Sequence, residues 1–251
     1  MTLASDLYDQ LLPGKVEQVL LGASRTVVLM HTDSGLHAGM SSTIYQGEYD
    51  KLDTPRSIQA GTMRGMDVRD LAQLFEAPNQ REVSIGLAAI NAALPMPQTD
   101  EVVINGEDYL VEHFGGKNVA LIGHFPFVEF SRNKFRNLWV LELKPRPGDL
   151  PASETPSILP LADVIALTAT TLINKTFDHV MSFRKPETPV LMLGPSTPLS
   201  PVMFDHGVNI LAGTIITQPE KAFQTFQEGG SLHYVRTQGF LRFVNLTRSV
   251  Y

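Results

Sequence analysis

Residues that could do chemistry gather at the ends of four short apolar runs in the second half of the chain. In chain order these residues are Gly123, His124, Phe125, Pro126, Glu142, Thr170, Asn174, Gly194, Pro195 and Ser196. An imidazole and a carboxylate together can hold a hard or borderline cation, or can act as an acid/base pair on a bound organic molecule. We therefore expect a ligand site formed by these residues, with His124 and Glu142 as the candidate metal ligands.

Gly123 and Glu142 have the spacing of a dinucleotide site, but the motif is incomplete. In that motif three glycines let the backbone approach a pyrophosphate, and an acid about 20 residues later binds a ribose hydroxyl. Glu142 follows at that spacing, yet only Gly123 is present of the three glycines. Two structural interpretations stay open: the His124 ring turns to solvent in a tight turn, and Glu142 pairs with Lys144 or Arg146.

Other polar residues are weaker candidates. His31, Asp33 and His37 could meet across a hairpin as nitrogen and oxygen ligands, although polar residues beside a turn are more often solvated. Ser196 lacks the Gly-x-Ser-x-Gly elbow of a hydrolase nucleophile. Asn91 falls on an apolar helical face, where a hydrogen-bonded core amide is the expected role, and the alternative is that this face looks into a cleft between two domains.

The apolar runs that precede the polar clusters predict buried parallel strands. Their residues do not alternate between apolar and polar, which is typical of a parallel sheet covered by helices on both faces. In such sheets ligands bind beyond the carboxyl ends of the strands, where all the polar clusters fall. The runs are 119–127, 138–149, 163–174 and 189–201, and 208–216 and 240–246 predict a fifth and a sixth strand. Residues 176–183 and 219–228 predict helices with Thr176 and Thr217 as N-caps.

The first half of the chain predicts a different kind of domain. Three strand patterns are followed by a stretch with several Gly and Pro residues and then by two helix patterns, which indicates an antiparallel meander packed on helices. The strands are expected at 16–22, 25–31 and 36–42, the Gly- and Pro-containing stretch at 47–65, and the helices at 67–77 and 80–94. We place the boundary within 95–117, which gives domains 1–105 and 106–251.

Net charge, cysteine content and the lengths of apolar segments exclude several kinds of site and partner. The formal net charge is -6 and no basic stripe is present, so binding to nucleic acid is not expected. The chain has no cysteine, which excludes thiolate metal sites and cysteine nucleophiles. We find no secretory signal and no apolar segment long enough to span a bilayer, so we expect a cytoplasmic protein with no membrane partner.

Five phrases of the sequence resemble one known family. They are GHFPFVE, LELKPRPGDLP, ADVIALTATTLINKT, MLGPSTPLSP and IGLAAINAAL, and they occur in the family's order over nearly the whole chain. The chain is similar to bacterial and archaeal heavy-metal-chelation proteins, a family of unknown function. The resemblance implies an N-terminal domain similar to that of enolase, a C-terminal Rossmann-like domain and a site in the cleft between them.

Three functions stay open on these grounds. The first is binding of a small polar or anionic ligand in that cleft, such as a metal chelator or a metal complex, with a divalent metal as the candidate cofactor. The second is a nucleotide-cofactor enzyme of the dehydrogenase or methyltransferase type. The third is a non-catalytic sensor or scaffold. Whether the protein is an enzyme, and whether it forms a homo-oligomer, is left open by the sequence.

Overall fold

The computed structural model describes residues 2–44, 59–97 and 104–248. These residues form two compact units, each assembled from segments that are distant in sequence. Unit 1 comprises the segments Met1–Gln98, Pro195–Val202 and Thr214–Arg242, and unit 2 comprises Thr99–Gly194, Met203–Gly213 and Phe243–Tyr251. Part of the expected Gly- and Pro-containing stretch (47–58) and part of the expected boundary (98–103) lie outside the described residues. The division into domains 1–105 and 106–251 stays a prediction.

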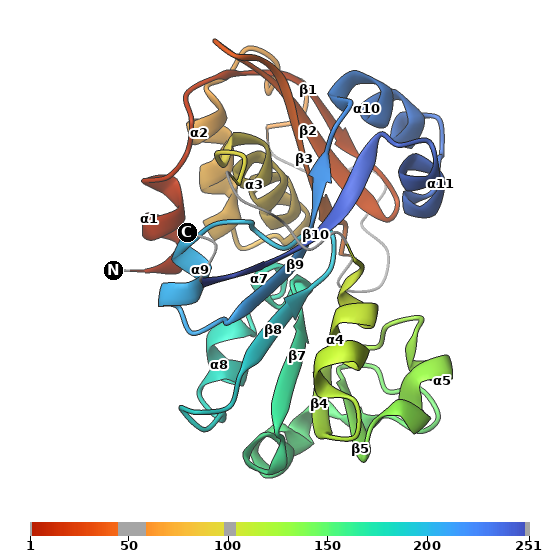
Figure 1. Ribbon diagram of the computed structural model, residues 1–251. Helices are drawn as coiled ribbons and strands as arrows, with labels where there is room; N and C mark the ends of the chain where they lie inside the picture. Colours follow the sequence, from red (N-terminus) through yellow and green to blue (C-terminus); the bar gives the residue numbers. More distant parts are fainter. Residues whose placement is uncertain (1, 45–58, 98–103, 249–251) are drawn as a thin grey trace. The chain divides into compact units, whose positions relative to one another are not determined.

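Unit 1 contains an antiparallel sheet of three strands, β1 (Lys15–Leu21), β2 (Arg25–Thr32) and β3 (Gly35–Ser42), in the order β1-β2-β3. Helices α3 (Gln80–Ala93) and α10 (Pro219–Gln227) both contact β2 and β3, and they lie on opposite sides of this sheet (Figure 1). The expected meander packed on helices is confirmed. The unit also contains α1 (Leu3–Tyr8), α2 (Val68–Ala72), the 3₁₀ helix η1 (Gln73–Glu76) and α11 (Leu232–Thr237).

Two glycines let helix α3 pack closely on its neighbours: Gly39 at the contact with β3, and Gly86 at the contact with η1. Asn79 caps its first turn by accepting a hydrogen bond from the Arg81 amide, and the chain becomes extended at Leu94, just before Pro95. A Cβ on Gly39 of β3 would overlap the backbone of α3 at Ala88 and Ala92. Sheet and helix therefore meet backbone to backbone, which only glycine permits.

The start of α10 differs from the expectation. Its N-cap position is occupied by Gln218 and not by Thr217, because the Thr217 hydroxyl instead donates to the carbonyl of Gly239 at 2.8 Å. The Thr217 amide also donates to Phe240, the residue before strand β10 (Leu241–Thr247). This long-range pairing uses both donors of Thr217.

Most of unit 2 is built on a parallel sheet. The complete sheet has seven strands in the order β10-β9-β8-β7-β4-β5-β6, and every pair from β9 to β6 is parallel. The first four residues of β7 and all four of β8 are buried, so side chains are covered on both faces of the sheet. The expected mostly parallel α/β fold is confirmed. The strands are β4 (Asn118–Ile122), β5 (Asn137–Glu142), β6 (Leu150–Pro151), β7 (Val164–Thr168), β8 (Val190–Leu193) and β9 (Ile210–Ile216).

Short helices connect these strands. They are α4 (Gly106–Phe114), α5 (Val128–Ser131), α6 (Thr155–Ile158), α7 (Thr170–Ile173), α8 (Phe177–Met181) and α9 (Val202–Asp205), with 3₁₀ helices η2 (Arg132–Lys134), η3 (Ala152–Glu154) and η4 (Leu159–Leu161). The apolar run 163–174 is therefore a strand followed by a helical turn. The strand ends at Thr168 because its hydroxyl accepts from the Thr170 amide and its carbonyl accepts from the Thr171 hydroxyl.

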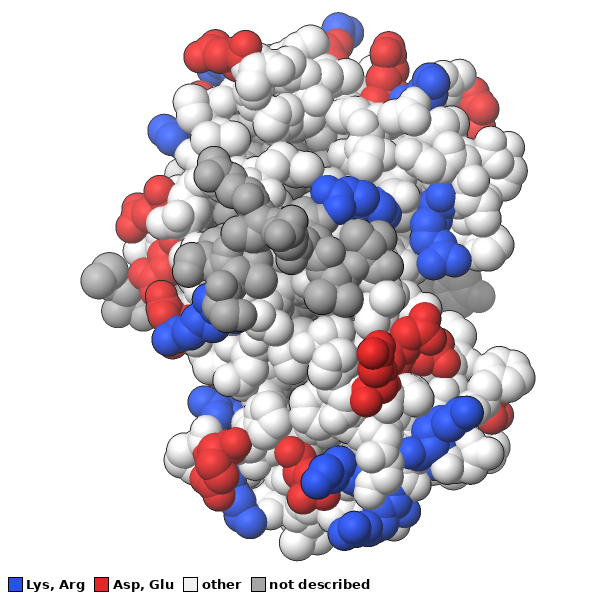
Figure 2. Space-filling model, viewed as in Figure 1, with Lys and Arg blue, Asp and Glu red and all other residues white. Residues whose placement is uncertain are grey.

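Charged side chains are scattered over the face shown in Figure 2, where Lys and Arg lie in small groups between similar groups of Asp and Glu. Among the described residues, no helix combines the length and the apolar character that a bilayer crossing needs.

Gly86→Ala is expected to lower the free energy of unfolding by about 1–2 kcal/mol. In an exposed helix this change would add about 0.5–1 kcal/mol of helix propensity. Here, however, a Cβ at position 86 overlaps the backbone of Phe75 in η1, and backbone cannot move aside as a flexible side chain can. Urea unfolding monitored by circular dichroism measures the effect. A variant as stable as the wild type would contradict this contact.

Candidate functional site

A pocket of about 290 Å³ lies in unit 2 beyond the carboxyl ends of β4, β5 and β7. Within the sheet, β5 and then β6 are added on one side of strand β4. The chain then returns, and β7 pairs with the other side of β4. The strand order therefore reverses between β4 and β7. In open parallel sheets this reversal leaves a crevice that binds ligands.

Gly123 lines this pocket at the end of β4. It has a φ of +95°, and a Cβ there would lie 2.8 Å from Cγ2 of Thr168. Its amide donates to the Leu141 carbonyl at 2.9 Å, which joins the turn after β4 to strand β5. Both the backbone angle and the close approach require glycine at this position.

Glu142 joins the same two strand ends through its carboxylate. Oε2 accepts from the His124 amide at 2.8 Å, and Oε1 accepts from the amides of Leu143 at 2.8 Å and Lys144 at 3.4 Å. The expected alternative, an ion pair with Lys144 or Arg146, does not form within the described residues. Backbone amides satisfy the carboxylate instead, and the carboxylate in turn fixes the shape of both turns.

Asn174 and a group of threonines also line this pocket. The Asn174 Oδ1 accepts from the Thr176 amide at 3.2 Å and from its hydroxyl at 2.6 Å, so the amide nitrogen Nδ2 is left as a hydrogen-bond donor. The Thr176 side chain therefore does not cap α8, contrary to the expectation, although Thr176 occupies the N-cap position. Between them, Lys175 has a φ of 58°, the one positive φ of a non-glycine residue in the described part of the chain.

Thr168 and Thr170 provide hydroxyls to the lining, and their oxygens are 3.0 Å apart. Because one of the two hydroxyls must donate to the other, one O–H of the pair remains available. Four of the expected residues, Gly123, Glu142, Thr170 and Asn174, thus line one pocket.

His124 belongs to a buried pair next to this pocket and is not among the lining residues. Its side chain is 4% exposed, and Nδ1 lies 2.8 Å from Oδ2 of Asp149, whose side chain is fully buried. Its Nε2 is buried without a hydrogen-bond partner, 3.9 Å from Oε1 of Glu129. Asp149 was missed from the sequence because no spacing rule links it to His124.

The other expected site residues have separate surroundings. Phe125 stacks on Phe127 with ring centroids 5.4 Å apart, and Pro126 is exposed and precedes the N-cap of α5. Gly194 ends β8 with a φ of +114°. Pro195 and Ser196 belong to unit 1, where the Ser196 hydroxyl accepts from the Ser42 amide at 2.8 Å.

The described residues contain no group of three or more His, Asp or Glu side chains that could hold a metal ion. His37 Nε2 lies 3.1 Å from the Ser34 hydroxyl, and His31 Nε2 lies 4.0 Å from Glu17, so the expected hairpin trio is not assembled. A bare ion would find at most isolated ligands, such as the unpartnered Nε2 of His124. The role of His124 and Glu142 as metal ligands stays a prediction.

Gly123→Ala should lower the free energy of unfolding by about 1–3 kcal/mol more than Gly194→Ala. Both glycines end strands of unit 2 with positive φ, so both variants carry the backbone cost, but a Cβ at position 194 meets nothing within 4 Å. Urea unfolding measures the free energy of unfolding of both variants, and the difference between them is the cost of the overlap with Thr168. If both variants lose the same free energy, the Thr168 side chain moves aside without cost.

We expect neutral His124 to carry its proton on Nδ1, because the Asp149 carboxylate accepts a hydrogen bond there. The ¹⁵N chemical shifts of the ring should therefore show a protonated Nδ1 and an unprotonated Nε2. Asp149→Asn should weaken this tautomer preference. A ring protonated on Nε2 in the wild type would contradict the pairing.

Comparisons with known proteins agree with this architecture. A solved structure of a protein of unknown function from the DUF364 family of Desulfitobacterium hafniense matches with a TM-score of 0.80 and 23% identity, covering 98% of this chain and 97% of that one. A DUF364 protein of unknown function from Pyrococcus horikoshii matches with a TM-score of 0.74 and 21% identity, covering 97% and 96%. At these identities the matches show the fold.

Sequence comparison gives the family. An uncharacterized protein of Methanocaldococcus jannaschii is 27% identical over 155 residues, which are 56% of this chain and 57% of that protein. The DUF4213 family matches residues 5–94, and the DUF364 family matches residues 107–245, more than half of the chain. None of these matches favours a nucleotide-cofactor enzyme or a scaffold. The chain belongs to the DUF364 family, and both matching families carry the description "Putative heavy-metal chelation".

Proposed function

We propose that this protein binds a small, oxygen-rich chelator together with its metal in the pocket beyond β4, β5 and β7. The observation that carries the proposal is the lining of that pocket, which offers hydrogen-bond donors but no Lys or Arg among the described residues that form it. The proposal is for binding and includes no reaction. The expectation that the ligand lies between two domains stays a prediction.

The available hydrogen-bond groups favour a ligand with many acceptors. Asn174 has a free amide nitrogen, and the Thr168 and Thr170 pair retains one O–H. The carboxylate of Glu142, in contrast, already accepts three backbone hydrogen bonds. Carboxylate, hydroxyl and carbonyl oxygens are the acceptors that such donors bind, and they are also the atoms with which chelators hold hard and borderline metals.

The charge of the pocket favours the metal complex over the free chelator. A free polycarboxylate would bring several negative charges next to Glu142, with no Lys or Arg in the lining to offset them. Desolvating uncompensated charge is costly. A bound divalent metal cancels part of the chelator's charge before it enters the pocket, and the chelator supplies the ligands that the protein lacks. This agrees with the family's description.

Isothermal titration calorimetry tests the proposal with citrate complexes of Ni²⁺, Co²⁺ and Zn²⁺, with citrate alone and with each metal salt alone. We expect at least one complex to bind at least 10-fold more tightly than free citrate. Asn174→Ala should weaken that binding about 5-fold, because a hydrogen bond of about 1 kcal/mol is lost.

Asn133→Ala is the matched control, because Asn133 is exposed and does not line the pocket. Its affinity should equal that of the wild type. The proposal fails if free citrate binds as tightly as its complexes, if Asn174→Ala and Asn133→Ala behave alike, or if no complex binds to the folded protein.

A further inference from the structure

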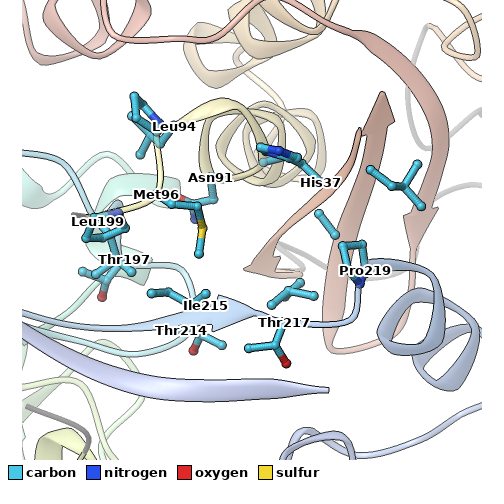
Figure 3. Close-up of a pocket in the computed structure, with 16 residues that line it drawn as sticks. His37, Asn91, Leu94, Met96, Thr197, Leu199, Thr214, Ile215, Thr217 and Pro219 are labelled. Carbon is cyan, nitrogen blue, oxygen red and sulfur yellow. The ribbon is translucent and has the colours of Figure 1, made fainter. Parts of the chain in front are cut away.

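A second pocket, of about 220 Å³, lies entirely within unit 1 (Figure 3). Its walls come from β3, the C-terminal end of α3, the segment around Thr197 and the turn from β9 to α10. These segments are far apart in the sequence, and β3 is an edge strand of its sheet, so the pocket sits where the sheet ends.

Most residues that line this pocket are apolar, among them Leu36, Ala38, Leu94, Leu199 and Ile215. The polar members of the lining are His37, Asn91 and three threonines. Asp, Glu, Lys and Arg are absent from the described residues that line it. An apolar cavity with few polar groups is the usual form of a small-molecule site, and the absence of carboxylate, ammonium and guanidinium groups favours an uncharged ligand.

Asn91 supplies a directed polar group in this pocket. Its Nδ2 donates to the carbonyls of Met40 at 2.9 Å and Ser196 at 3.1 Å, so the amide cannot be reversed without placing oxygen against two carbonyl oxygens. Its Oδ1 is buried and has no hydrogen-bond partner. A buried acceptor without a donor is unfavourable unless a ligand or a water supplies the donor.

Met96 lines the same pocket as Asn91. Met96 is half-exposed and its thioether chain is flexible, so its methyl group can respond to a ligand that enters the pocket. The Thr214 hydroxyl is also buried without a partner, but in Figure 3 it points away from Asn91.

We propose that this pocket is a second ligand site, for a small, uncharged and mostly apolar molecule that donates one N–H or O–H to Oδ1 of Asn91. This site does not depend on the pocket beyond β4, β5 and β7, because the two pockets are lined by residues of different units.

Methyl NMR of the full chain, labelled with [methyl-¹³C]methionine, tests this site. The Met96 signal is assigned with Met96→Leu and followed during titration with two pairs of probes. These are 2-piperidone against N-methyl-2-piperidone, and isobutyramide against N,N-dimethylisobutyramide. We expect each N–H probe to shift the Met96 signal and to bind at least 5-fold more tightly than its N-methylated counterpart.

Two variants localise the response. Asn91→Leu should remove the preference for N–H probes, and Ala38→Leu, which fills the pocket, should abolish the Met96 response. Ala23→Leu adds the same side chain at an exposed position outside the pocket and should respond as the wild type does.

If Asn91→Leu does not fold, the probe pairs and Ala38→Leu still decide the question. Equal affinity within both pairs, a Met96 signal unchanged by all four probes, or an unchanged response of folded Ala38→Leu would overturn the proposal. None of these results bears on the titrations with metal citrates.

Discussion

The site of unit 2 depends on the Glu142 carboxylate and the three backbone amides that it accepts. One amide belongs to His124 in the turn after β4, and the other two belong to the turn after β5. The carboxylate therefore holds two strand ends together at the reversal of the sheet. It also fixes the backbone of His124, whose ring can then reach Asp149. A neutral side chain would accept fewer of these bonds and would leave backbone donors in the two turns without this partner.

In each unit, a glycine allows two neighbouring elements to approach closely. In unit 2, Gly123 passes the side chain of Thr168 at a distance that excludes a Cβ. In unit 1, Gly39 and Gly86 bring α3 against β3 and η1 in the same way. Each pocket lies beside such a contact, because Gly123 and Thr168 line one pocket, and Ala92, whose backbone meets Gly39, lines the other. The two pockets nevertheless differ in chemistry, since one is rich in hydroxyls and the other is mostly apolar.

Local patterns in the sequence predicted the elements better than the ends of those elements. Unbroken apolar runs correctly indicated parallel strands covered on both faces, because burial on two faces leaves no polar positions. Thr176 occupies the expected N-cap position of α8, but its hydroxyl donates to Asn174 and makes no capping bond. The N-cap at Thr217 was wrong, since Gln218 occupies that position and the Thr217 hydroxyl donates to Gly239. The third run, 163–174, is a strand only as far as Thr168, whose hydroxyl and carbonyl bond to Thr170 and Thr171 at the start of α7.

The sequence by itself determined the fold class and which polar residues stand at strand ends, because both follow from local periodicity and turn chemistry. Only the tertiary structure decided which of them meet. Gly123, Glu142, Thr170 and Asn174 line one pocket, whereas His124 turns to Asp149, 25 residues away along the chain. The Asn91 amide oxygen is left unpaired because carbonyls of two distant segments, at Met40 and Ser196, take its nitrogen. Such pairings depend on the paths of loops and on backbone approaches, which no short-range sequence rule constrains.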